Sequence, residues 1–350
     1  MTGELNVGLF VYLHKFCTDR GYSLEVEKSD YGLPGQLEKL YDWDKFFEIN
    51  EFPFEPYDYQ KQAVKTALER QRAILLSPTG SGKSYIIYLA VKYWITMLSQ
   101  GVGYPKAGRV LIVVPTTSLV EQMYADFIDY GQNEKSMHRI YSGKDKNINT
   151  SIVISTWQSI YKNPKKWFEQ FGMIIGDECH GFKSKSLSSI MNKATEAKYK
   201  IGTTGTLDGT QTHKLVLEGL FGPVHKVTTT KNLQKDKTLA DLNISILTLK
   251  YSDDIRKQVK DYNYQDEIDF IVSYDKRNKF IRNLAVDQKG NTLVLFQRVD
   301  KHGKILFDLI TDKIPSDRKV FFVSGQTETS DREAIRKIVE KQHGAIIVAS

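Results

Sequence analysis

The chain has 350 residues, enough for about two domains, and its 41% hydrophobic and 26% charged content is typical of a soluble globular protein. A net charge of +7 favours polyanionic partners, although 42 acidic residues are interspersed. No uncharged apolar stretch reaches the roughly 18 residues of a membrane span, so we expect no membrane partner. Only Cys17 and Cys179 are present. They make no disulfide framework and suit a reducing compartment, so we expect a cytoplasmic protein. We also expect a monomer.

The first 45 residues give the weakest signals. Leu9–Tyr22 has helical spacing, and Ser23–Val26 is compatible with a strand. We therefore assign residues 1–45 to a short N-terminal α+β segment.

Strand-like and helix-like runs alternate from residue 73 to residue 206. The expected strands are Ala73–Leu76, Val110–Val114, Ile152–Ser155, Met173–Ile175 and Lys200–Thr204. A helix is expected over Ser118–Tyr130 and is closed by Gly131. This alternation predicts a parallel sheet covered by helices on both faces, and we assign residues 46–230 to this first α/β domain. Ligands of such sheets collect at the carboxyl ends of the strands.

The alternation of strand-like and helix-like runs is lost over residues 207–275. Within this stretch we assign residues 231–275 to a linker region with a charged helix and one strand, Ile244–Leu249. A second alternating set then follows. Helices are expected over Arg277–Gln288, Lys301–Thr311 and Ser330–Lys341, and strands over Asn291–Phe296, Lys319–Val323 and Ala345–Val348. Complete α/β sheets usually have more strands, so residues 276–350 are expected to form an incomplete second domain.

A glycine-rich loop lies between the first strand and the following helix. Its sequence, residues 77–84, is Ser-Pro-Thr-Gly-Ser-Gly-Lys-Ser. In this context, backbone N–H groups and a helix N-terminus converge on one anion, as in phosphate-binding loops. Lys83 would supply charge for the β- and γ-phosphates of ATP, and the Ser84 hydroxyl would bind Mg²⁺. Ser77 departs from the glycine of the usual pattern, and the alternative is a chance Gly/Ser-rich turn. The expected nucleotide ligands are Thr79, Gly80, Ser81, Gly82, Lys83 and Ser84.

An acidic pair follows the buried run at residues 171–176. Asp177 is placed to hold Mg²⁺ opposite the loop, and Glu178 to polarise the attacking water. An Asp-Glu pair alone is more often solvated surface, but its position after a strand and a phosphate loop favours catalysis. Lys83, Asp177 and Glu178 are therefore the expected catalytic residues.

Five segments together resemble the motifs of superfamily 2 helicases in their order. They are residues 79–84, Pro115–Gln122, Thr156–Ser159, Asp177–His180 and Thr204–Thr206. Within that superfamily, Pro164–Phe168, Phe171–Met173 and Lys276–Lys279 resemble the phage UvsW-type DNA helicases, over nearly the whole chain from about Gly8. The resemblance implies two tandem RecA-like domains, the second truncated here. It also implies that residues 1–45 are part of a small DNA-binding domain that precedes them.

The resemblance also implies roles for residues that the phosphate loop and the acidic pair do not include. Gln60, after Tyr59, would read the adenine, although a glutamine at an ordinary helix start is the alternative. His180, Thr204 and Thr206 would couple hydrolysis to movement; a plain turn after a strand is the alternative for the two threonines. The implied nucleic-acid contacts are Thr116, Thr156, Gln158, Arg298, Ser324, Gly325 and Arg332. Helix capping is the alternative for the two threonines, and a solvated charge for Arg332.

The implied function is an ATP-dependent DNA helicase or translocase that remodels branched DNA in phage recombination, replication and repair. It would act by fork regression, branch migration and R-loop unwinding, so RNA in R-loops is a further partner. The protein would then work in the cytoplasm of the host cell. The family's last two motifs, with an arginine finger, are expected after Ser350, so the first alternative is a nucleotide- and DNA-binding fragment with little turnover. The other alternative functions are a restriction-enzyme motor subunit or an RNA helicase. A P-loop kinase would leave Pro115–Gln122 and Thr204–Thr206 unexplained.

Overall fold

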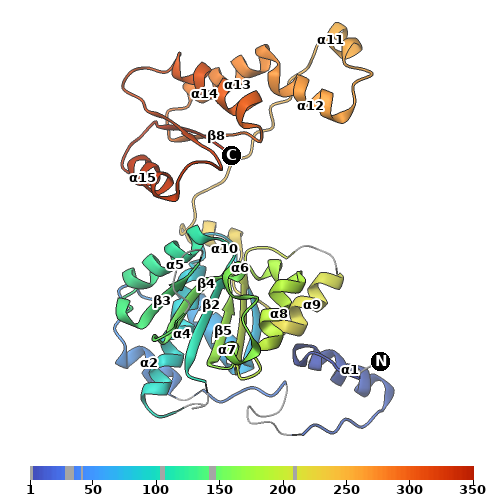
Figure 1. The fold of residues 1–350 in the computed structure, drawn as a ribbon, viewed down its shortest axis with the longest axis vertical. Helices are drawn as coiled ribbons and strands as arrows, with labels where there is room; N and C mark the ends of the chain where they lie inside the picture. The colour runs from blue at the N-terminus through green and yellow to red at the C-terminus, as the bar shows by residue number, and fades with distance from the viewer. Residues whose placement is uncertain (1–2, 28–34, 41, 103–106, 142–146, 208–210) are drawn as a thin grey trace. The chain divides into compact units, whose positions relative to one another are not determined.

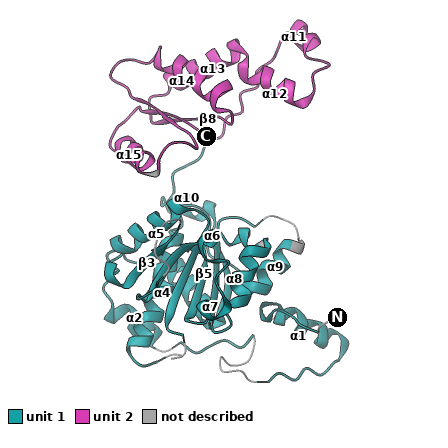
Figure 2. Cartoon of the chain, viewed as in Figure 1, with its two compact units in different colours: residues 1–242 teal, residues 243–350 magenta. Residues whose placement is uncertain are grey.

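The computed structural model describes residues 3–27, 35–40, 42–102, 107–141, 147–207 and 211–350. Its chain divides into two units, residues 1–242 and residues 243–350, which are coloured teal and magenta in Figure 2. The limits of the predicted linker and domains within this division remain predictions.

A seven-stranded parallel sheet forms the centre of the first unit, with the strand order β3-β4-β2-β5-β6-β1-β7. The strands are β1 (Arg72–Leu76), β2 (Arg109–Val114), β3 (Met137–Ile140), β4 (Ile152–Thr156), β5 (Phe171–Gly176), β6 (Tyr199–Thr204) and β7 (Val224–Lys226). Every strand pair in it is parallel. The predicted parallel α/β fold is therefore confirmed. The central strands are apolar runs because both faces of the sheet are buried.

Helices cover both faces of this sheet (Figure 1). One face carries α2 (Trp43–Ile49), α3 (Asp58–Arg70), α4 (Lys83–Ser99) and α5 (Thr117–Asp129). The other carries α6 (Trp157–Ile160), α7 (Lys165–Phe168), α8 (Lys185–Lys193) and α9 (Gln211–Phe221). Successive strand residues belong to opposite faces: Leu75 packs with the first set and Ile74 with the second. Two short 3₁₀ helices are η2 (Glu134–Ser136) and η3 (Cys179–Lys183).

The N-terminal helix α1 (Phe10–Arg20) follows a 3₁₀ turn, η1 (Val7–Leu9), and confirms the predicted helix. The turn packs closely on α9, where a Cβ at Gly8 would lie 2.0 Å from the carbonyl oxygen of Glu218. Tyr12 also donates a 2.6 Å hydrogen bond to the Glu218 carboxylate. The predicted strand at Ser23–Val26 is wrong, because these residues pair with no strand in the described chain.

The second unit has a three-stranded parallel sheet of order β8-β10-β9. Its elements are α11 (Asp253–Gln258), α12 (Tyr264–Ser273), α13 (Asp275–Asp287), β8 (Thr292–Leu295), the π-helical turn η4 (Val299–Gly303), α14 (Lys304–Thr311), β9 (Val320–Val323), α15 (Thr329–Glu340) and β10 (Ile346–Ala349). The six elements predicted from residue 277 onward are thus confirmed. The strand predicted at Ile244–Leu249 is wrong: this segment pairs with no strand of the described residues, and Ile246 is 87% exposed. Among the described residues, no helix is long and apolar enough to cross a bilayer.

Candidate functional site

The glycine-rich loop connects β1 to α4 at the carboxyl edge of the sheet. Gly80 and Gly82 have φ values of 83° and 74°, which side chains disfavour. A Cβ at Gly82 would also lie 2.5 Å from Gln60 Nε2. Helix α4 begins at Lys83, so the unpaired N–H groups of its first turn lie at the loop. Backbone and helix terminus thus form the anion-binding geometry that the sequence predicts.

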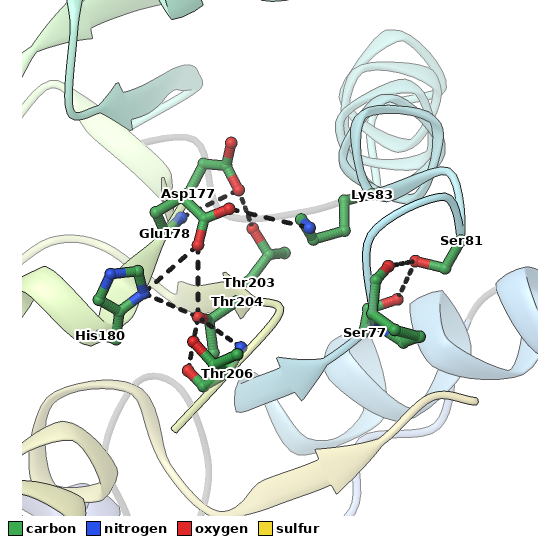
Figure 3. A network of polar contacts seen from close by, with 10 residues as sticks. Ser77, Ser81, Lys83, Asp177, Glu178, His180, Thr203, Thr204 and Thr206 are labelled. Carbon is green, nitrogen blue, oxygen red and sulfur yellow. Dashed lines mark hydrogen bonds and ion pairs between the residues drawn. The ribbon is translucent and has the colours of Figure 1, made fainter. Parts of the chain in front are cut away.

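Ser77, the departure from the usual loop pattern, connects the start of the loop to its middle (Figure 3). Its buried hydroxyl lies 2.6 Å from the Ser81 hydroxyl, which donates a 2.6 Å hydrogen bond to the carbonyl of Pro78. The Ser77 N–H donates to the Thr204 carbonyl at 2.9 Å, which ties the loop to the end of β6. Side-chain hydrogen bonds therefore close the loop at the position where a glycine is usual.

Gln60 and its neighbour Tyr59 attach the start of α3 to the same loop. Gln60 Nε2 and the Tyr59 hydroxyl each donate a 3.1 Å hydrogen bond to the Ser81 carbonyl. Gln60 Oε1 accepts a 3.0 Å bond from the Tyr57 N–H, and the side chain is only 4% exposed. Gln60 thus lies beside the phosphate loop, and its amide is engaged by backbone groups. Adenine reading stays a prediction for this residue.

Asp177 lies directly after β5 and is only 8% exposed. Its Oδ1 accepts a 2.7 Å hydrogen bond from the Thr203 hydroxyl and a 3.0 Å bond from the Glu178 N–H. Burial raises the pKa of Asp177, while these two hydrogen bonds and the charge of Lys83 act in the opposite direction. The carboxylate is thus less favoured than usual, and a bound cation would stabilise it.

The loop and the acidic pair face each other (Figure 3). Lys83 Nζ lies 3.8 Å from Glu178 Oε1, and both side chains are partly buried. Glu178 itself has a φ of 47°, in the left-handed region where non-glycine residues are uncommon. Such strained residues cluster at functional sites. The three predicted catalytic residues are therefore brought together.

The donor set fits Mg²⁺. In the described chain, both hydrogen bonds recorded for the Asp177 carboxylate go to Oδ1, so Oδ2 is the oxygen left for a cation. Ser84, on the first turn of α4, adds a hydroxyl oxygen. Mg²⁺ typically takes one or two protein oxygens and completes its shell with phosphates and water. A carboxylate and a hydroxyl beside a phosphate loop match that preference.

The predicted coupling residues form a polar chain beside Glu178 (Figure 3). His180 Nδ1 lies 2.9 Å from Thr204 Oγ1 and 3.3 Å from Glu178 Oε2. Thr204 Oγ1 is also 2.9 Å from the carbonyl of Thr206. A Cβ at Gly205 would lie 3.6 Å from Lys83 Nζ, so this turn reaches the phosphate loop. The end of β6 therefore contacts both the loop and the acidic pair.

Two residues of the site were missed by the sequence reasoning. Thr203 binds Asp177 directly. The sequence pattern that could have revealed it is strand alternation, because Thr203 faces the side of β6 opposite to Thr204. Tyr130 lies 2.9 Å from the Ser84 hydroxyl, and no motif marks it. Cys179, in contrast, is fully buried in the apolar core, which agrees with a packing role.

The predicted nucleic-acid contacts of the first unit follow two paired strands. β2 and β4 run parallel with Val114 opposite Thr156, so the segments that follow them start side by side. Thr116 caps α5 by accepting a 3.3 Å hydrogen bond from the Leu119 N–H. Thr156 is 5% exposed, and its hydroxyl lies 2.9 Å from that of Ser159. Gln158 Nε2 donates to the Pro115 carbonyl at 3.3 Å, which links the two motifs.

In the second unit, the predicted contacts follow β8 and β9. Arg298 pairs with Asp269 of α12, so its charge is already partnered. Arg332 donates a 2.8 Å hydrogen bond to the carbonyl of Ser324, which is 5% exposed, while Gly325 is exposed. Arg332, Ser324 and Gly325 are thus brought together, and Arg298 lies after a different strand.

A parallel sheet with a phosphate loop on one strand and an acidic pair on another defines the class of P-loop nucleotide hydrolases. Comparison with known proteins agrees. A family model described as Type III restriction enzyme, res subunit, matches residues 53–209. The ATP-dependent DNA helicase uvsW of Enterobacteria phage T4 is 36% identical over 99% of this chain and 69% of its own length.

Further comparisons are consistent with this. The crystal structure of T4 UvsW matches with a TM-score of 0.55 and 34% identity, over 99% of this chain and 68% of that one. The DNA 3'-5' translocase XPB2 of Sulfurisphaera tokodaii is 26% identical over 84% of this chain and 70% of its own length. This chain belongs to the superfamily 2 helicases, in their UvsW-type group.

Proposed function

We propose that this chain is an ATP-driven DNA helicase or translocase that remodels branched DNA. The observation that carries the proposal is the pairing of Lys83 with Glu178, which joins the phosphate loop to the acidic strand end. Similarity to an ATP-dependent DNA helicase over 99% of the chain supports DNA as the track. Fork regression, branch migration and R-loop unwinding are the forms of remodelling that we expect.

Each residue of the site has one task in this proposal. The loop amides and Lys83 hold the β- and γ-phosphates of ATP, and Ser84 and Asp177 hold Mg²⁺. When bound, Mg²⁺ neutralises charge that develops on the phosphates. Glu178 accepts a proton from the attacking water, which forms a bond to the γ-phosphorus as the bond to ADP breaks. Catalysis then rests on positioning and charge stabilisation.

The polar chain from Glu178 through His180 and Thr204 to Thr206 supports a coupling role. These contacts involve the group that must exchange protons with the attacking water. A change at Glu178 during hydrolysis would alter hydrogen bonds at the end of β6. The predicted DNA contacts after β2 and β4 lie on the same edge of the sheet. Contacts with DNA phosphates there would position a DNA strand without reading its sequence.

The test is ATP hydrolysis with no nucleic acid, with single-stranded DNA, with duplex DNA, with forked DNA and with RNA. We expect DNA to increase the rate and forked DNA to increase it most. Glu178→Gln should bind nucleotide but lose turnover, while Glu169→Gln on the surface should behave as the parent chain. Stimulation by RNA alone would move the substrate to RNA. Parental turnover by Glu178→Gln would contradict the assigned mechanism.

A further inference from the structure

A tyrosine outside every recognised motif contacts the predicted metal ligand. Tyr130 follows α5, and its hydroxyl oxygen lies 2.9 Å from Ser84 Oγ. Its backbone is fixed as well, because the Tyr130 N–H donates a 2.9 Å hydrogen bond to the Asp126 carbonyl at the end of the helix. The contact joins the end of α5 to the first turn of α4, and the two residues are 46 positions apart in sequence.

The ring of Tyr130 is held by other aromatic rings. Its centroid lies 4.8 Å from that of Tyr85, 5.3 Å from that of Tyr88 and 6.0 Å from that of Phe54. Such contacts leave the ring little freedom to turn. The phenol oxygen is therefore fixed next to Ser84 before any nucleotide arrives.

Either hydroxyl of this pair can donate the hydrogen bond. A phenol is a stronger donor than an alkyl alcohol, and a serine oxygen accepts through two lone pairs. When Tyr130 donates, Ser84 Oγ keeps one lone pair for a cation and its own proton for a phosphate oxygen.

We propose that Tyr130 is a positioning residue that orients the Ser84 hydroxyl toward the metal of a bound nucleotide. The proposal rests on the nucleotide site of the proposed function and adds a partner behind its metal ligand. Partners behind metal ligands orient them and tune affinity. A free serine would lose side-chain rotation on binding the metal, whereas a serine held by Tyr130 has lost it already.

The test compares Tyr130→Phe with Tyr88→Phe. Both changes remove one hydroxyl from the same aromatic cluster, but Tyr88 Oη is buried with no hydrogen-bond partner in the described part of the chain. Binding of a fluorescent ATP analogue is titrated with Mg²⁺ and repeated in EDTA. We expect Tyr130→Phe to need about two- to tenfold more Mg²⁺ for half-saturation, the range that one neutral hydrogen bond gives. Affinity in EDTA should not change, and Tyr88→Phe should match the parent chain in both arms.

A double-mutant cycle with Ser84→Ala shows whether the effect passes through the serine. In the Ser84→Ala background, Tyr130→Phe should have no further effect on the Mg²⁺ requirement. An unchanged requirement in Tyr130→Phe would overturn the proposal, and so would a lower one, because the tyrosine would then compete with the metal. If the parent chain itself binds no nucleotide with Mg²⁺, the proposed function fails rather than the role of Tyr130.

Discussion

The hydrogen bond from Thr203 to Asp177 gives a quantitative prediction. Thr203 is fully enclosed in β6, and its hydroxyl donates to the buried carboxylate at 2.7 Å. Thr203→Val keeps nearly the same shape and removes only this donor. The ionised form of Asp177, which must hold Mg²⁺, then loses one of its two recorded hydrogen bonds.

The magnitude follows from the type of bond. A hydrogen bond to a charged group contributes about 1.5–3 kcal/mol, which corresponds to about a 10- to 100-fold change in an equilibrium. Burial already raises the pKa of Asp177, and the Thr203 bond lowers it, so the substitution raises the pKa further. Because protonation removes the metal ligand, Mg²⁺-dependent nucleotide binding is lost as the pH falls through this pKa. In Thr203→Val the loss should begin at a higher pH.

The assay is binding of a fluorescent ATP analogue with Mg²⁺ over a range of acidic to neutral pH. Thr66→Val is the matched control, because Thr66 is also buried in the first unit but its recorded partner is Gln62. Thermal unfolding shows whether both variants keep the fold. If Thr203→Val and the parent chain lose nucleotide binding at the same acidic pH, the assigned role of this bond is refuted.

Three further predictions concern the loop, the coupling chain and the DNA surface. Lys83→Ala should weaken Mg²⁺·ATP binding by about 10- to 100-fold, because it removes a charged partner of the phosphates. Lys92→Ala on the same helix is the control and should not weaken binding. Equal affinities of Lys83→Ala and the parent chain in calorimetry would contradict the loop assignment. Thr204→Val should keep nucleotide affinity but lower the ratio of unwinding to ATP hydrolysis, and a preserved ratio in a coupled helicase assay would count against its role. DNA affinity, measured by fluorescence anisotropy, should fall linearly on a log–log plot against salt, because phosphate contacts release counterions; a flat response would exclude backbone-led binding.

The main sheet could be predicted because its central strands are apolar on both faces and short loops separate them from helices. β3 and β7 were missed for a physical reason. β3 carries His138 and Arg139 in a run of four residues, and β7 has three residues that are at most partly buried. Both lie at the edges of the sheet, where polar side chains reach solvent and the apolar signal weakens.

The strand predicted at Ile244–Leu249 shows the opposite error. Its content of isoleucine and leucine fits a strand, but a strand also needs a neighbour, and none in the described chain pairs with it. A short apolar segment alone could not supply that information.

The phosphate loop and the acidic pair could be located because each is a local pattern after a strand. Thr203 and Tyr130 could not be placed with equal ease, because their roles depend on side chains that meet only in the folded chain. Gln60 shows a further limit. The sequence predicts that it reads the adenine, whereas its two hydrogen bonds to backbone groups required the structure.

The most direct test of the central claim is where a metal binds relative to the nucleotide. Mn²⁺ in place of Mg²⁺ allows its coupling to the ³¹P nuclei of bound ATP to be measured by electron–nuclear double resonance. We predict a clear ³¹P coupling in the parent chain and its loss, or a large fall in Mn²⁺ occupancy, in Asp177→Ala. Mn²⁺ that binds Asp177→Ala as tightly as the parent chain, with the same coupling, would show that the acidic strand end does not hold the metal of the nucleotide.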